Sequence, residues 1–237
     1  AVLRGHGRRA TTAQFVPGRK LLATGGSDRM VRLWRVPGGQ SAGVLSGHTS
    51  TVYLVATSSD GKQLASTASN QRVRIWSLPD GKPLRVIKGL PRGIETIVFG
   101  PGRRLLMAVG SDLRVYDVDT GKRVTTLRGH RSEIVRLHTT RDKRYAITSG
   151  RDNRVFLWDL KTLQPVQHTR FDILPLAVAM SSDHRRFAVG TGVPLYLFPF
   201  EPTLWKQAPR ELLQRAEKTA DLRLDRFRLV PLTSSGK

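Results

Sequence analysis

The 237-residue sequence contains no cysteine, so disulfide bonds and thiolate chemistry are excluded. It also lacks a run of about 18 apolar residues, the length that a membrane-spanning helix needs, so no membrane partner is expected. No N-terminal segment combines a basic end, an apolar centre and a small-residue cleavage site, as a secretory signal would. These absences predict the cytoplasm or another intracellular reducing compartment.

Acidic residues are also scarce. The 18 aspartates and glutamates face 40 lysines and arginines, which gives a formal net charge of +22. Such a field attracts polyanions, with nucleic acid the first candidate. The alternative is an arginine-rich codon usage, although this does not by itself explain so few acids. Charge carries no information about the fold.

Aromatic residues make up only 7% of the chain, yet they are regularly placed. Five segments of apolar and β-branched residues share one register, and their aromatic anchors are Trp34, Trp76, Tyr116, Trp158 and Phe198. The successive separations are 42, 40, 42 and 40 residues. A second marker keeps the same phase, namely the pairs Gly5-His6, Gly47-His48 and Gly129-His130, with Gly89-Leu90 in the third slot. Two independent markers therefore indicate one repeat.

A repeat of 40–45 residues with Gly-His and Trp-Asp signatures resembles the WD40-repeat family. Trp-Asp itself stands at Trp158-Asp159, with Tyr116-Asp117 close to it. The resemblance covers residues 1–200 and implies an all-β WD40-type β-propeller with five readable four-stranded blades. Turns rich in Gly, Asp, Asn and Pro between the apolar runs agree with this fold. Residues 201–237 are expected to form a C-terminal extension with a short helix that begins near Ala208-Pro209.

The ends of the chain leave three arrangements open. Residues 1–4 resemble the outer strand of a blade, so they could complete the fifth blade and close a five-bladed ring. Alternatively, the chain is a fragment of a longer propeller protein, or an open array that a partner supports. The alanine at position 1, in place of methionine, favours the fragment.

His, Ser or Thr, and Asp recur together, which invites a hydrolase interpretation. The WD40 resemblance implies instead a structural tetrad, in which Asp holds His, His meets a hydroxyl, and the hydroxyl meets the tryptophan indole. The implied sets are His6/Thr24/Asp28/Trp34, His48/Ser66/Asn70/Trp76, with Asn for Asp, and His130/Thr148/Asp152/Trp158. A catalytic triad needs to occur only once, whereas this set occurs three times in register. We therefore expect no catalytic residue, no metal ligand and no cofactor, and the chain is predicted not to be an enzyme.

The third and fifth repeats depart from the pattern. The third has Leu90 in place of His, Tyr116 in place of Trp, and a turn that is two residues shorter. The fifth has no Gly-His pair, and Gly190-Thr191-Gly192 stands where the turn aspartate is expected. Irregular blades are often places where a partner docks, although sequence drift explains them equally well.

Basic residues are expected on both ends of the blades. The end with the Gly-His loops is the candidate partner-binding rim, with Arg8, Arg9, Arg29, Arg72, Arg92, Arg131, Arg151 and Arg154. The opposite turns are the candidate polyanion-binding face, with Arg19, Lys20, Lys62, Arg103, Arg104, Lys143, Arg144, Arg185 and Arg186. The favoured function is a scaffold that mediates protein–protein interactions within a larger complex. The alternative is a basic propeller that binds structured RNA or another polyanion, for example on the ribosome, although no stacking aromatic platform is visible.

Overall fold

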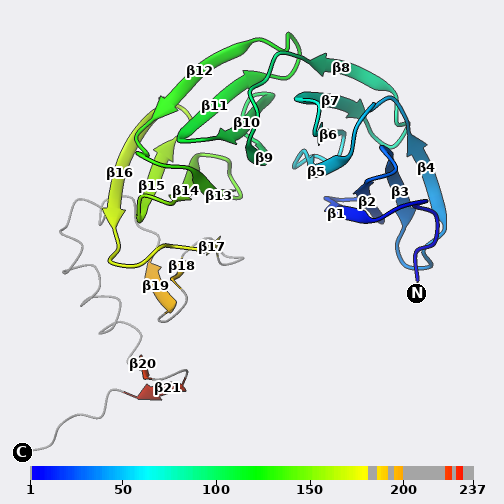
Figure 1. Cartoon of the computed structure of the whole chain (residues 1–237). Coiled ribbons are helices and arrows are strands. Elements are labelled where there is room, and N and C mark those ends of the chain that lie inside the picture. Colours follow the sequence, from blue (N-terminus) through cyan, green and yellow to red (C-terminus); the bar gives the residue numbers. More distant parts are fainter. Residues whose placement is uncertain (1, 181–185, 192–194, 200–221, 226–227, 232–237) are drawn as a thin grey trace, which may run out of the picture. The chain divides into compact units, whose positions relative to one another are not determined.

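The computed structural model describes residues 2–180, 186–191, 195–199, 222–225 and 228–231, and all of their regular elements are β-strands (Figure 1). Within these ranges no helix is long and apolar enough to cross a membrane. The predicted C-terminal helix near residue 208 lies outside the described residues. The last described elements, β20 (Leu222–Asp225) and β21 (Arg228–Pro231), pair as a two-stranded antiparallel sheet.

Each repeat forms one sheet in which neighbours in the chain are neighbours in the sheet. The first blade is β1 (Ala10–Val16), β2 (Leu21–Gly26), β3 (Val31–Arg35) and β4 (Ser41–Leu45). The second blade is β5 (Val52–Thr57), β6 (Gln63–Ala68), β7 (Arg72–Ser77) and β8 (Pro83–Ile87). The third blade is β9 (Ile94–Phe99), β10 (Arg104–Val109), β11 (Asp112–Asp117) and β12 (Arg123–Arg128). These sheets are the four-stranded blades that the repeat predicts.

The fourth blade is also complete, with β13 (Ile134–Thr139), β14 (Tyr145–Gly150), β15 (Arg154–Asp159) and β16 (Gln164–Arg170). The fifth sheet has three described strands, β17 (Ala177–Met180), β18 (Arg186–Gly190) and β19 (Leu195–Pro199). The chain divides into two compact units, residues 1–109 with 114–125, and residues 110–113 with 126–237. The first unit holds the first two blades and most of the third, and the second unit holds the fourth and fifth.

The blades share local irregularities as well as strand order. The first hairpin of a blade shifts register near its open end, between Ala10 and Thr12, between Val52 and Leu54, and between Ile134 and Arg136. A second shift falls next to the anchor tryptophan, where the third strand meets the fourth, as at Leu33/Trp34 and Leu157/Trp158. Such bulges increase the local twist of a sheet. The repeat therefore specifies backbone geometry as well as side-chain type.

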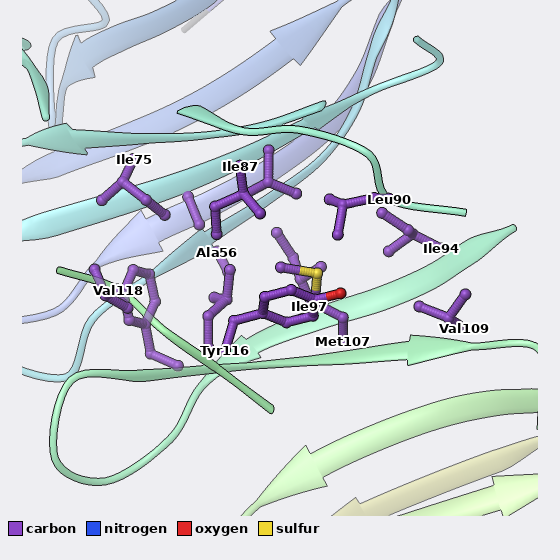
Figure 2. Close-up of a cluster of buried hydrophobic side chains, with 14 residues drawn as sticks. Ala56, Ile75, Ile87, Leu90, Ile94, Ile97, Met107, Val109, Tyr116 and Val118 are labelled. Carbon is purple, nitrogen blue, oxygen red and sulfur yellow. The ribbon is translucent and has the colours of Figure 1, made fainter. Parts of the chain in front are cut away.

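The apolar core lies between sheets, in separate clusters. One cluster in the first unit joins the second and third blades through residues such as Ile75, Ile97, Met107 and Tyr116 (Figure 2). Another joins the first and second blades around Leu33 and Trp76. In the second unit, Phe187 and Phe198 stack with their ring centroids 5.0 Å apart in the cluster of the fourth and fifth blades. Burial of these faces is the main stabilising contribution to each pair of blades.

Candidate interaction surface

The Gly-His loop of the first blade is held by one continuous hydrogen-bond chain. The Nδ1 atom of His6 lies 3.0 Å from each carboxylate oxygen of Asp28, and its Nε2 atom lies 2.8 Å from Thr24 Oγ1. The indole N–H of Trp34 donates to Thr24 Oγ1 at 2.8 Å. Because a carboxylate only accepts, Nδ1 carries the imidazole proton and donates to Asp28. The carboxylate also accepts the backbone N–H of Gly7 at 3.2 Å, so it fastens the loop directly.

The fourth blade repeats this arrangement. His130 Nδ1 lies 2.9 Å from Asp152, His130 Nε2 lies 2.8 Å from Thr148 Oγ1, and the Trp158 indole donates to Thr148 Oγ1 at 2.8 Å. The backbone N–H of Arg131 donates to the second carboxylate oxygen of Asp152 at 2.8 Å. The side chain of His130 has no exposed surface. Buried in this way, it is a fixed structural group rather than a general base that a substrate could reach.

Burial and hydrogen bonding set the pKa values of both tetrads. Burial alone would raise the pKa of Asp28 and of Asp152, but the bonds that these carboxylates accept outweigh it and hold each pKa below its ordinary value. Burial lowers the pKa of His130, although Asp152 opposes the shift. The networks therefore contain an ionised carboxylate, and His130 is held as a neutral imidazole at neutral pH.

In the second blade only part of the tetrad forms, which corrects the assignment of Asn70. His48 Nε2 lies 2.7 Å from Ser66 Oγ, and the Trp76 indole donates to Ser66 Oγ at 2.8 Å. Asn70 instead donates its amide to Thr49 Oγ1 at 2.7 Å. The Nδ1 atom of His48 and the amide oxygen of Asn70 are both buried and without a hydrogen-bond partner. Burial, together with the charge of Arg74, lowers the pKa of His48 to about 4.

The third blade replaces the polar loop with apolar packing. Leu90, in the slot of the histidine, is 2% exposed and belongs to the cluster drawn in Figure 2, where it lies beside Ile94. An open pocket of about 590 Å³ adjoins this loop. It is lined by the loop and the start of β9, by the β6–β7 turn, and by β5, that is by Pro91, Arg92, Gly93, Ile94, Glu95, Ser69, Gln71 and Tyr53. The pocket thus lies where the Gly-His signature is lost.

Two side chains give this pocket its chemical character. Tyr53 is half-buried, and burial together with the nearby carboxylate of Glu95 raises the pKa of its hydroxyl. Glu95 is exposed and forms no ion pair with any described base. Of the predicted rim residues, Arg92 lines the pocket. Neither Tyr53 nor Glu95 was predicted as a site residue. Each lies on the first strand of its blade, and only the loop that precedes β9 departs from the repeat.

The remaining rim arginines occupy the loops and turns of their own units. In the first unit Arg8, Arg9 and Arg29 are exposed and Arg72 is half-buried. In the second unit Arg131 and Arg151 are exposed and Arg154 is half-buried. Arg151 pairs with Glu133 at 2.9 Å, so one of these charges is neutralised.

The candidate polyanion face is less uniform than its sequence suggests. Arg103 makes two hydrogen bonds to Asp119, and Arg144 pairs with Asp159 at 2.9 Å. Lys143 donates to Thr139 at 2.8 Å, and burial lowers the pKa of its amine. Arg19, Lys20, Lys62 and Arg186 are exposed, Arg104 is half-buried, and Arg185 lies outside the described residues. The acids of these turns therefore neutralise some of the predicted bases, whereas Arg19, Lys20 and Lys62 form no ion pair with a described acid.

The blades and their loops define a class of protein. The recurrent His, Ser/Thr and Asp residues hold loops between strands, and among the described residues no group of three His, Cys, Asp or Glu side chains could hold a metal ion. The class is that of a repetitive β-propeller protein, in which loops and turns join the strands of each blade.

The comparison with known families makes this more specific. The model of the WD domain, G-beta repeat, matches residues 1–35, 39–77 and 121–159. The chain belongs to the WD40-repeat family, whose members are in general non-enzymatic protein-interaction scaffolds. The matched segments contain the three Gly-His pairs, and the third and fifth repeats, which depart from the pattern, are not matched.

Two curated proteins are similar to parts of the chain. Transducin beta-like protein 3 of Bos taurus is 30% identical over 161 residues, which cover 67% of this chain and 15% of that protein. Pre-mRNA-processing factor 19 homolog 2 of Arabidopsis thaliana is 24% identical over 172 residues, which cover 69% of this chain and 32% of that protein. The chain therefore spans less than a third of the length of either relative.

Proposed function

We propose that this chain is a scaffold subunit of a larger complex and that it holds a partner protein at the third-repeat pocket, beside Tyr53, Arg92 and Glu95. The observation that carries the proposal is the pocket itself, which opens where Leu90 replaces the loop histidine. Tyrosine and arginine are enriched among the residues that contribute most to protein–protein binding. A pocket that contains both, next to a carboxylate without an ion partner, suits a polar partner segment better than an apolar one.

The contrast with the regular blades supports this location. In the first and fourth blades the loop histidine is tied to Asp28 or Asp152, and the polar groups of that network are satisfied within the blade. At the pocket, Arg92 and Glu95 are exposed and are not committed to a tetrad. Groups that are not used within the fold are available to a partner.

The test is site-specific photocrosslinking in the cells from which the protein comes, with a photoreactive residue at Arg92 or, as the control, at Lys122, an exposed base of the β11–β12 turn. We expect the same partner to crosslink at Arg92 and not at Lys122, with or without nuclease. Tyr53→Phe, which keeps the ring packed on the core, and Glu95→Gln should each reduce the yield several-fold at unchanged melting temperature. Equal yields from both sites, or yields that neither substitution changes, would refute the proposal.

The binding of RNA or another polyanion remains the second candidate function. One observation favours it, namely a second pocket in the first unit whose lining contains bases and no acid. This pocket lies at the opposite ends of the strands from the Gly-His loops, so the two functions are tested separately.

A further inference from the structure

A pocket of about 600 Å³ lies at the β1–β2 and β3–β4 turns of the first blade. Its lining includes Arg19 and Lys20 from the first turn, Arg35 and Gln40 from the second, and Pro79 from the neighbouring blade. It contains three bases and no acid. Arg35 was not among the predicted basic residues, because it ends a strand rather than lying within a turn.

Backbone pairing brings these bases together. Leu21 and Arg35 are partners across β2 and β3, and the backbone N–H of Val36 donates to the carbonyl of Lys20 at 2.9 Å. The two turns are therefore held side by side by the sheet itself. Arg19 is oriented by a bond from its Nε to the carbonyl oxygen of Gly61, at 2.8 Å. This bond uses one donor and leaves the two terminal nitrogens of the guanidinium for a ligand.

The charges of this pocket are not neutralised by the described acids. Arg19, Lys20 and Arg35 are exposed and form no ion pair within the part of the chain that the structure describes. Arg103 and Arg144, on the corresponding turns of other blades, are paired with Asp119 and Asp159. Two acids lie in the turns next to this pocket. Asp60, beside the Gly61 carbonyl that Arg19 contacts, is occupied by the hydroxyl of Ser58 at 2.6 Å and the backbone N–H of Lys62 at 3.0 Å, and Asp80, beside Pro79, forms no ion pair with a described base. The first blade thus concentrates uncompensated charge in a concave site.

We propose that this pocket binds phosphates of a nucleic-acid backbone, with Arg19, Lys20 and Arg35 as the contacting cations. Arginine presents two terminal donors that match phosphate oxygens, and lysine adds a point charge. An extended phosphodiester is favoured over a single phosphate because the pocket is open and the exposed Lys62 and Lys82 continue the charge onto the next blade. The bases contact the backbone and not base edges, so binding depends on charge and shape rather than on sequence.

The experiment is fluorescence anisotropy of the full chain with a labelled RNA hairpin of about 20 nucleotides, and with a DNA duplex of equal length, over a salt titration. The test variant is Arg19→Ala/Lys20→Ala/Arg35→Ala. The matched control is Lys88→Ala/Lys122→Ala/Arg123→Ala, which removes three exposed charges elsewhere in the first unit. Arg35→Glu alone avoids disturbing the bond from Arg19 to Gly61. Melting temperatures show that each variant is folded.

We expect the test variant to weaken binding at least about tenfold at low salt and to reduce the slope of log affinity against log salt by about 2 to 3, as expected for three lost phosphate contacts. The control should change affinity less than about threefold, in line with loss of the general field. Arg35→Glu should show a loss between the two. Binding of either the RNA or the DNA supports the proposal, and a preference for one assigns the shape that is recognised.

Three results would overturn the proposal. The first is an equal loss of affinity in the test and control variants, which would show only diffuse attraction. The second is a slope that the test variant does not change. The third is binding of a phosphoserine peptide at this pocket with no binding of either nucleic acid. None of these results bears on crosslinking at Arg92, so failure here is distinguishable from failure of the proposed scaffold function.

Discussion

The second and fourth blades contain the same histidine–hydroxyl–tryptophan chain and differ at the residue that completes it. In the fourth blade Asp152 accepts hydrogen bonds from the His130 imidazole and from the backbone N–H of Arg131. In the second blade Asn70 donates to Thr49, and His48 Nδ1 has no partner. The distances from the hydroxyl oxygen to the histidine Nε2 and to the indole nitrogen are nevertheless nearly the same in both blades, at 2.7–2.8 Å. The carboxylate is therefore not needed to form the inner part of the chain, and its effect is to fasten the loop.

The comparison has an energetic consequence. A buried polar atom without a hydrogen bond costs about 1–3 kcal/mol relative to a satisfied one. Two such atoms, His48 Nδ1 and Asn70 Oδ1, belong to the tetrad residues of the second blade, whereas neither His130 nor Asp152 contributes one. The second blade should accordingly be the less stable of the two at its Gly-His loop.

The largest expected effect comes from removing the histidines. His130→Ala should lower the free energy of unfolding by about 3 kcal/mol, because it strands a largely buried carboxylate and opens a cavity. His48→Ala should cost about 1–2 kcal/mol, since no carboxylate is left unpaired there. Urea unfolding followed by tryptophan fluorescence measures both. Equal losses would contradict the view that the carboxylate distinguishes the blades.

A smaller loss of stability is expected when the tetrad aspartate of the fourth blade is replaced by the asparagine found in the second blade. Asp152→Asn should cost about 2 kcal/mol, because a charged acceptor of hydrogen bonds is replaced by an amide that offers only one oxygen. Asp172→Asn is the control, since Asp172 is an exposed acid of the same unit. If the two substitutions had the same effect on the urea midpoint, the change would be one of net charge and not of the tetrad.

Much of this fold could be predicted from the sequence, because the period of the aromatic anchors and the Gly-His pairs reflects a repeated backbone. The destination of the Asn70 amide could not be predicted, since Thr49 and His48 are adjacent and both are within reach of the turn. The pocket beside Tyr53 and Glu95 depends on strands 42 residues apart in the chain. The uneven charge of the candidate polyanion-binding face could not be predicted for a similar reason. Residue types state the sign of a charge, but only the structure shows that Arg103 and Arg144 meet acids while Arg19 and Arg35 do not.

The reverse conversion should stabilise the protein. Asn70→Asp supplies the second blade with the acceptor that its histidine lacks, and we expect a gain of about 1 kcal/mol at neutral pH, after the cost of burying the new charge. Gln71→Glu is the control because it adds the same charge at the next residue of the turn. The same urea assay applies. A neutral or destabilising Asn70→Asp would mean that the turn of the second blade cannot bring a side chain to His48.

The smallest effect concerns how the stability of the second blade depends on pH. Burial holds the pKa of His48 at about 4 in the folded protein, whereas an unfolded histidine titrates near 6.5. Between these values the unfolded state binds the proton and the folded state does not, so stability falls as the pH falls from about 6.5 to about 4. The carboxylate of Asn70→Asp would raise the pKa of His48 and make this fall shallower, by less than about 1 kcal/mol between pH 7 and pH 5. Asp28 and Asp152 titrate alike in both proteins, so their contributions cancel when the two unfolding profiles are subtracted. Parallel profiles, together with an unchanged NMR titration of the His48 imidazole, would show that the new carboxylate does not reach the histidine.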